Sequence, residues 1–153
     1  MEYNQMFREA KRELSLAEHI MTVTLPFLND KKIYFNILEH INNAIFNGMR
    51  SFLLMKKEHK ELRIVPESNE LAKQLFFEMY TDSLGLSSLD ERFINELEHI
   101  LKSYKKSQVE IERGQNQLIV LPSYETVSVN DDKIKKYLKD AKDFITKTEK
   151  GLV

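Results

Sequence analysis

The segment from about residue 31 to residue 61 carries an apolar arc that is too wide for a helix lying on a protein surface. A surface helix needs an apolar stripe only a little over ~100° wide, and this arc covers about twice that width. Such a helix must bury two sides, either at the centre of a helical bundle or between its own bundle and a second copy of the chain. The residues of the arc are Ile33, Tyr34, Phe35, Ile37, Leu38, Ile41, Ala44, Ile45, Phe46, Met49, Phe52, Leu53 and Met55.

Gly48 lies inside this long helical segment. A glycine there costs up to ~1 kcal/mol relative to alanine, and the usual reason for keeping it is the close approach of a second helix. The pattern therefore predicts a helix crossing at Gly48.

Apolar residues at helical spacing also mark helices on either side of this segment. The first, about residues 3 to 24, is expected to stop or kink just before Pro26, whose ring removes a helical hydrogen bond. The last helix opens at the capping sequence Ser128-Val129-Asn130-Asp131. Its narrow apolar stripe is typical of a surface helix and consists of Ile134, Leu138, Ala141, Phe144 and Ile145.

Two further helices follow the long one. The third, about residues 68 to 82, has Ser68 as its expected N-cap. The fourth runs to about Tyr104 from the sequence Ser88-Leu89-Asp90-Glu91, which has the form of a capping box. The residues expected to face inward are Leu71, Leu75, Phe76 and Met79 on the third helix, and Phe93, Leu97, Ile100, Leu101 and Tyr104 on the fourth.

The spacing of apolar residues changes from helical to alternating before the last helix. Residues 109–112 alternate between apolar and charged, residues 113–116 are turn-like, and residues 118–121 form an apolar run closed by Pro122. This pattern predicts one small β-hairpin, about residues 108 to 121, that packs on the bundle or adds to a partner's sheet, because a lone hairpin is marginal in water. The predicted fold is all-α: a five-helix bundle, one domain over residues 1–153, with the hairpin before the last helix.

Composition narrows the function classes. The 153 residues are 42% hydrophobic and 31% charged, as expected for a globular chain, and the net charge of −1 gives no overall attraction to nucleic acid or an anionic membrane. The absence of cysteine excludes disulfides, thiol catalysis and thiolate metal sites. No apolar run reaches the ~18 residues of a membrane span, and the charged N-terminus is unlike a signal peptide. We therefore expect a cytoplasmic protein with no membrane partner.

Each of the four histidines follows a glutamate, which suggests metal binding. A di-metal site in a helical bundle, however, needs two Glu-x-x-His pairs and two further carboxylates on inward faces. Only Glu96 and His99 have this spacing. We expect no metal site and no cofactor.

A polar stripe on the long helix contains short amide side chains where lysine and glutamate are the usual choice. One interpretation is that the stripe is the solvent face of a half-buried helix. The alternative is a polar cleft between helices, because amides both donate and accept hydrogen bonds. The residues predicted to line this cleft are Asn36, His40, Asn43 and Asn47.

Lysines 102, 105 and 106 gather at the end of the fourth helix. Cations at a helix C-terminus are stabilised by the helix dipole by about 0.3–1 kcal/mol, which is one explanation. The alternative is a phosphate- or nucleic-acid-binding patch with an aromatic ring for base stacking. The residues predicted for it are Tyr104, Lys105, Lys106, Ser107 and Arg113.

With these helices placed, the chain resembles the HEPN class, small all-α bundles named for higher eukaryotes and prokaryotes and nucleotide binding. The resemblance covers the helical order over most of the chain and an Arg-x6-His match, Arg92 to His99 in ERFINELEH. Members with ribonuclease activity use such a pair across a dimer, the histidine in acid/base chemistry on the 2′-hydroxyl and the arginine on the phosphate. The resemblance thus implies Arg92 and His99 as catalytic residues, although Arg12 and His19 have the same spacing.

The segment KKSQVEIERGQNQLIVLPSYETVS also resembles a group of archaeal helical proteins with a KKSPVEF-like stretch, which brings no activity with it. Three function classes are left open. The first is a nucleotide- or RNA-binding module, a homodimer and the partner of a nucleotidyltransferase-like protein. The second is a structural or protein-interaction bundle. The third is a metal-independent ribonuclease that uses Arg92 and His99.

Overall fold

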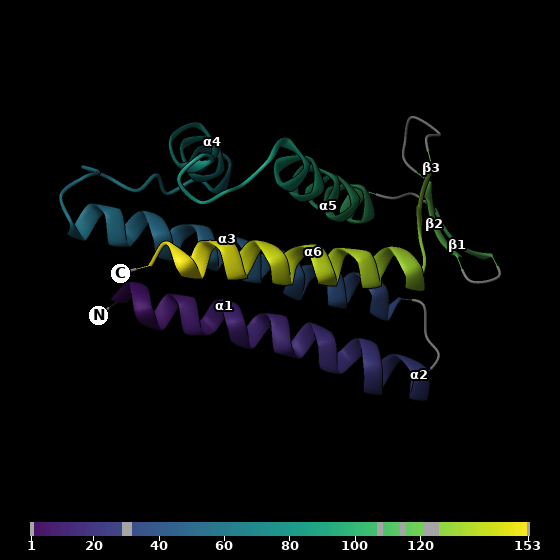
Figure 1. Cartoon of the computed structure of the whole chain (residues 1–153). Helices are drawn as coiled ribbons and strands as arrows, with labels where there is room; N and C mark the ends of the chain where they lie inside the picture. Colours follow the sequence, from purple (N-terminus) through teal and green to yellow (C-terminus); the bar gives the residue numbers. More distant parts are fainter. Residues whose placement is uncertain (1, 29–31, 107–108, 114–115, 121–125, 153) are drawn as a thin grey trace.

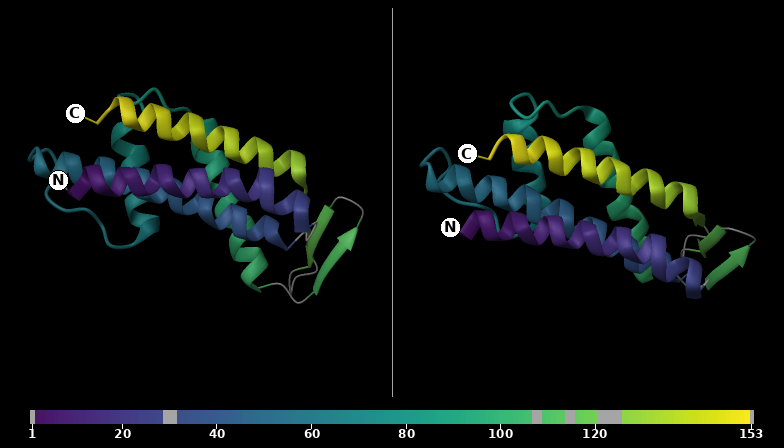
Figure 2. Two further views of the ribbon diagram at one scale, coloured as in Figure 1. Left: turned by 90° about the horizontal axis from the view of Figure 1, so that it is seen from below. Right: turned by 60° about the horizontal axis from the view of Figure 1, so that its bottom comes forward.

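Three long helices lie side by side and two shorter helices cross them. The computed structural model describes the backbone of residues 2–28, 32–106, 109–113, 116–120 and 126–152, and the side chains of these residues outside 109–127. Figures 1 and 2 show α1, α3 and α6 running lengthwise while α4 and α5 cross one face of this layer. The strands lie at one end of the bundle, and the two chain termini lie at the other. The long helices are α1 (Glu2–His19), α3 (Ile33–Glu58) and α6 (Asp131–Lys150), and the crossing helices are α4 (Asn69–Tyr80) and α5 (Ser88–Lys106).

Helix α3 is the centre of the bundle. It contacts α1, α4, α5 and α6, and every residue of the predicted apolar arc except Ile33 is buried. Ile33 is half-buried against the same core. The arc is therefore covered by the chain's own helices, so the bundle explains its width without a second copy of the chain.

The helix crossing predicted at Gly48 is confirmed. A Cβ atom built on Gly48 would come within 2.8 Å of Ile145 Cδ1 on α6. This separation is shorter than the contact distance of carbon atoms, about 3.5–4.0 Å. Glycine thus lets α3 and α6 approach more closely than an alanine would.

The first predicted helix changes from an α-helix to a π-helical turn before Pro26. After α1 the chain makes a π-helical turn, η1 (Ile20–Thr24), and continues as α2 (Leu25–Leu28). The backbone N–H of Leu25 donates to the carbonyl of Ile20, five residues back. Because a proline has no N–H and its ring crowds the carbonyl four residues back, the wider turn accommodates it. The predicted disturbance is present, and the helix continues through Pro26 rather than stopping.

Helix α4 begins as predicted but buries a different face. Leu71 N–H donates to the Ser68 side chain over 3.3 Å, which confirms the N-cap. Leu71 and Met79, expected to face inward, are 56% and 52% exposed. The buried residues of α4 are Ala72, Phe76, Phe77 and Tyr80.

Aromatic packing explains why α4 buries a different face from the predicted one. The rings of Phe76 and Tyr80 meet Phe52 of α3 edge to face, with centroids 5.7 and 4.9 Å apart. Phe76 also lies 5.8 Å from the ring of Phe144 on α6. Aromatic side chains bury more surface than leucine or methionine and add favourable edge-to-face contacts. The aromatic side of α4 therefore faces the core, Leu75 is half-buried at its edge, and Leu71 and Met79 face outward.

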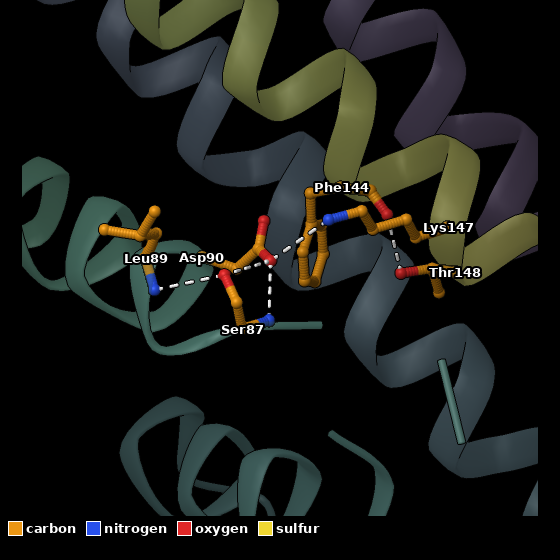
Figure 3. A network of polar contacts seen from close by, with 6 residues as sticks. All are labelled: Ser87, Leu89, Asp90, Phe144, Lys147 and Thr148. Carbon is orange, nitrogen blue, oxygen red and sulfur yellow. Dashed lines mark hydrogen bonds and ion pairs between the residues drawn. The ribbon is translucent and has the colours of Figure 1, made fainter. Parts of the chain in front are cut away.

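The capping box of α5 lies one residue earlier than predicted. Leu89 N–H donates to Ser87 Oγ over 3.2 Å, and Ser87 N–H donates to Asp90 Oδ2 over 2.9 Å. Ser87 and Asp90 thus take the roles expected for Ser88 and Glu91. Figure 3 shows that Lys147 of α6 also reaches Asp90 Oδ2, at 3.3 Å, so the same carboxylate caps α5 and ties it to α6.

The predicted hairpin is present with an added strand. β1 (Val109–Arg113) pairs antiparallel with β2 (Asn116–Val120), and β3 (Thr126–Val129) pairs on the other side of β2. Ser128 and Val129 were expected in the cap of the last helix but belong to β3. Asn130 is the N-cap of α6 and accepts from Lys133 N–H over 2.9 Å. Val129 is fully buried, which anchors the third strand to the bundle.

The described helices thus form the predicted all-α bundle, when α1, η1 and α2 are counted as one continuous rod. In this part of the chain, no helix combines the length and the apolar character needed to cross a bilayer.

Candidate functional site

A polar pocket of about 450 Å³ lies between α3, α4 and α5. Its volume falls within the range of roughly 300–1,000 Å³ typical of small-molecule sites. We call this site the polar pocket. Its lining comes from α3 (Glu39, Asn42, Asn43 and Phe46), α4 (Asn69 and Glu70) and α5 (Glu98, Leu101, Lys102 and Lys105).

The polar pocket has two well-buried apolar side chains among its polar ones. Phe46 and Leu101 are 6% and 7% exposed and belong to the hydrophobic core. Most of the other lining residues are exposed. Because α5 crosses α3 at a steep angle (Figure 2), the two helices bring residues far apart in sequence to one place. A ligand in the polar pocket would meet an apolar surface and polar groups together.

Asn42 has a buried atom that lacks a hydrogen-bond partner. Among the described side chains, its Oδ1 is the one buried oxygen or nitrogen with no partner. Leaving a buried acceptor unsatisfied costs about 1–3 kcal/mol. Asn42 is therefore the pocket amide that gains most from turning toward a hydrogen-bond donor that enters the polar pocket.

A second amide, Asn69, is held in place from outside the pocket. Its Oδ1 accepts from Arg50 Nε over 3.0 Å. Arg50 also donates to the carbonyls of Pro66 and Glu67, over 2.8 and 2.6 Å. These three bonds fix the entry to α4, so the α4 wall of the polar pocket is in place without a ligand.

The charges around the polar pocket are nearly balanced. Glu98 pairs with Lys73 of α4 over 2.8 Å, and both side chains are largely buried. Lys73 also donates to Asn95 Oδ1 over 2.7 Å. With Glu98 neutralised in this way, the lining keeps two cations, Lys102 and Lys105, and two carboxylates, Glu39 and Glu70. The two lysines lie three residues apart, on one face of α5, where they can meet one anionic group.

Of the residues predicted for a polar cleft on α3, Asn43 lines the polar pocket. His40 instead contacts Glu13 of α1, with Nδ1 2.5 Å from Oε2. Asn36 is exposed and Asn47 is half-buried, and neither lines the polar pocket. The polar pocket lies toward α5, so its α3 wall also includes Glu39, which belongs to the same polar stripe, and Asn42, which precedes Asn43.

Of the residues predicted for a phosphate patch, Lys105 lines the polar pocket, and Lys106 is exposed beside it. The ring of Tyr104 stacks on Phe35 of α3, with centroids 3.8 Å apart and planes 6° from parallel. One face of Tyr104 is therefore covered by α3 and is closed to a base. Ser107 lies outside the described residues, as does the side chain of Arg113.

The sequence patterns predicted Asn43 and Lys105 in two different sites, and they gave no prediction for Asn42 or Asn69. Asn42 directly precedes Asn43, so a predicted cleft that extended to the residues beside the polar stripe would have included Asn42. Asn69 has no such signal, because its place depends on how α4 packs against α3.

Arg92 and His99 lie on the same exposed face of α5. Both line a shallow depression whose residues all come from α5: Ser88, Glu91, Arg92, Asn95, Glu96 and His99. A catalytic site needs its acid, base and charge-stabilising groups arranged around one position where the reacting atoms can lie. The single chain provides this pair on one helix only. The other Arg-x6-His match is already engaged in part, because Arg12 pairs with Glu9 over 3.1 Å.

A smaller pocket of about 310 Å³ lies between α5 and α6. Tyr137 donates to Glu96 Oε2 there over 3.2 Å, and burial, followed by the charge of Glu96, raises the pKa of Tyr137 well above its usual range. Burial also raises the pKa of Asp140, with further contributions from Asp143 and Asp90. A tyrosine hydroxyl is protonated at neutral pH even without such a shift, and that of Tyr137 serves here as a donor.

In the described part of the chain, no three His, Cys, Asp or Glu side chains are grouped so that they could hold a metal ion. Comparison with known proteins finds no matching family model and no matching curated protein.

Proposed function

We propose that the chain is a HEPN-like nucleotide-binding module and that the polar pocket is its binding site. One observation carries the proposal: amides of α3 and lysines of α5 line the same pocket. A nucleotide needs both kinds of group, amides for the base and cations for the phosphate. The helical order of the bundle, which resembles that of the HEPN class, supports the same function.

The amides suit a nucleobase. An asparagine offers one acceptor and two donors in a plane, which is the arrangement that reads the edge of a base. Asn42 and Asn43 come from one wall of the polar pocket and Asn69 from another. Phe46 and Leu101 supply the apolar surface that the faces of a base require.

The lysines suit a phosphate. Lys102 and Lys105 are exposed, lie about one helical turn apart and line the polar pocket from α5. Lys106 is also exposed and is the last residue of α5, but it does not line the polar pocket. If the lysines serve only to offset the helix dipole, all three should behave alike.

Isothermal titration calorimetry with nucleoside monophosphates, and with the matching nucleosides, tests the proposal. We expect Lys102→Ala and Lys105→Ala each to weaken monophosphate binding about tenfold, or about 1.4 kcal/mol, with little effect on the nucleoside. Lys106→Ala is the matched control and should bind like the wild type. Absence of binding by any nucleotide, or an equal loss in Lys106→Ala, would overturn the proposal.

The same chemistry is present in a free nucleotide and in an RNA strand. For single-stranded RNA, log K falls with log salt by about 0.7 for each phosphate contacted, so a strand bound along several phosphates gives a steep slope. Two lysines on one phosphate give a shallow slope. We expect a mononucleotide to compete fully with a short oligoribonucleotide. Tight, steeply salt-dependent RNA binding that mononucleotides do not displace would assign RNA as the ligand.

Ribonuclease activity is the second candidate, favoured by the depression that Arg92 and His99 share. It requires a homodimer, because groups from a second copy must complete the site. His99→Ala should then abolish RNA cleavage with the fold intact, whereas His19→Ala should not. Equal cleavage by wild type and His99→Ala would exclude this activity.

The HEPN resemblance also supports a homodimer and a nucleotidyltransferase-like partner protein. Sedimentation of the chain alone, and of the chain mixed with such a protein, tests these two assemblies. A monomer that binds no nucleotide, no RNA and no such partner would favour a purely structural bundle.

A further inference from the structure

An apolar groove of about 460 Å³ runs along the outer side of α4, on the face that carries Leu71. Large contiguous apolar patches on a protein surface mark interaction sites, whereas single exposed apolar residues are ordinary. Ile64 is 69% and Leu71 is 56% exposed. We call this site the apolar groove. Its lining is Leu62, Arg63, Ile64, Pro66, Leu71, Gln74, Leu75 and Glu78.

The apolar groove is already formed in the single chain. One wall is α4, whose start is fixed by the Ser68 cap. The other wall is the segment 62–66, and Arg50 binds its end through the carbonyls of Pro66 and Glu67. A site whose walls are held in place loses little conformational entropy when a partner binds.

The shape of the apolar groove favours a helix as its occupant. A partner strand would have to pair with the backbone of segment 62–66, but Pro66 has no N–H to offer such a ladder. An amphipathic helix instead places aliphatic side chains at positions i, i+4 and i+7 into a groove without backbone pairing. Leu71 and Leu75 are themselves spaced by one turn along α4, which matches this repeat.

The charges beside the apolar groove indicate the sign of the charge that a partner should carry. Glu78 lies in its lining and Glu67 is exposed next to it, whereas Arg63 is the one lysine or arginine in the lining. The neighbouring Lys73 is paired with Glu98 on the other side of α4. The local excess of carboxylates favours a basic partner and disfavours an acidic one.

We propose that the apolar groove binds an amphipathic helix of a partner protein, with aliphatic residues on one face and lysine or arginine at its borders. This interaction does not depend on the polar pocket, which lies toward α3 and α5. A second copy of the chain is the competing occupant, and an experiment separates the two.

The probe is a fluorescein-labelled helical peptide of about 16 residues, long enough for marginal helicity, with leucines at positions i, i+4 and i+7 and flanking lysines. The matched peptide has glutamates in place of the lysines. We expect the lysine peptide to bind, by fluorescence anisotropy, at least tenfold more tightly than the glutamate peptide. Failure of the lysine peptide to bind, or equal binding of both, would overturn the proposal.

Variants then locate the binding surface. Leu71→Asp should reduce binding of the lysine peptide at least tenfold, and Ile64→Asp, at a more exposed position, should do the same. Leu89→Asp is the matched control, because Leu89 is 67% exposed and lies outside the apolar groove. Circular dichroism verifies that each variant is folded. Unchanged binding in both Leu71→Asp and Ile64→Asp, or an equal loss in Leu89→Asp, would overturn the proposal.

Sedimentation equilibrium tests the competing occupant. We expect no self-association that depends on the apolar groove. A wild-type dimer that Leu71→Asp converts to a monomer would show that a second copy fills the apolar groove, and the helix proposal would then be wrong.

Discussion

Helix α4 separates two sites of opposite character. On the side toward α3 and α5 lies the polar pocket, with amides and lysines around Phe46 and Leu101. On its outer side lies the apolar groove. The difference shows that the amphipathic pattern of a short helix does not by itself tell which side is buried. Aromatic contacts explain the orientation of α4, which leaves Leu71 exposed on its outer side.

The largest expected effect is a loss of stability caused by a substitution on the buried side of α4. Phe76 is fully buried against Phe52 and Phe144, whereas Leu71 is half-exposed. Phe76→Ala should lower the free energy of unfolding by about 3–5 kcal/mol, as is usual for a buried phenylalanine. Leu71→Ala should lower it by less than about 1 kcal/mol, because its side chain loses little burial. Urea unfolding of the two variants measures this contrast, and equal losses would contradict the orientation of α4.

The next largest effect is expected from Arg50, whose hydrogen bonds support one wall of each site. Arg50→Ala removes three hydrogen bonds to the entry of α4 and should lower the free energy of unfolding by about 1.5–3 kcal/mol. It should also weaken both nucleotide and peptide binding, because one wall of each site depends on Arg50. Lys57→Ala, an exposed cation near the end of α3, is the control. Normal binding at both sites in a folded Arg50→Ala would show that the walls do not need Arg50.

A smaller effect is expected from a substitution of Asn42 in the polar pocket. Asn42→Leu removes a buried acceptor that has no partner, so stability should stay the same or rise by up to about 1 kcal/mol. Nucleotide binding should nevertheless fall, because the amide is lost. Thermal unfolding and calorimetry together check the two effects. A variant that loses stability and keeps binding would mean that Asn42 is a structural residue.

The smallest effect depends on pH. Burial raises the pKa of Asp140 in the folded chain, so the folded state favours the protonated form. Its contribution to stability is fully present below the unfolded pKa and is lost as pH rises through the folded pKa. Asp140→Asn should therefore stabilise the chain at pH 7 by less than about 0.5 kcal/mol, with no gain at pH 3, as measured by urea unfolding. A gain at pH 3 that disappears at pH 7 would contradict this sign.

Periodicity and capping in the sequence predicted much of the bundle. The wide arc of α3, the crossing at Gly48 and the hairpin all follow from local patterns, although the arc alone allowed either a central helix or one shared with a second copy. The cap of α5 was misplaced by one residue because Ser87 and Ser88 are both suitable caps, and the contact of Asp90 with Lys147, which the sequence does not reveal, supports the first. The third strand was missed because its last two residues also match a capping sequence.

The site was predictable only in parts. Asn43 and Lys105 were each identified as unusual, one by its short amide on a helix face and the other by its place in a group of lysines. Their meeting in one pocket depends on the steep crossing of α3 and α5, and side-chain periodicity carries no information about that angle. The exposure of Leu71 likewise depends on which of two apolar faces of α4 meets the aromatic core.

Amide and methyl NMR shifts, recorded during one titration with a nucleoside monophosphate and a second with the lysine peptide, test the central claim that α4 separates two binding sites. We expect the nucleotide to shift the side-chain amides of Asn42 and Asn43 and the backbone of residues 102–105, and to leave the methyl groups of Ile64 and Leu71 unchanged. The peptide should give the reverse pattern. Nucleotide shifts at Ile64 and Leu71, or none at Asn42, Asn43 and residues 102–105, would contradict the account.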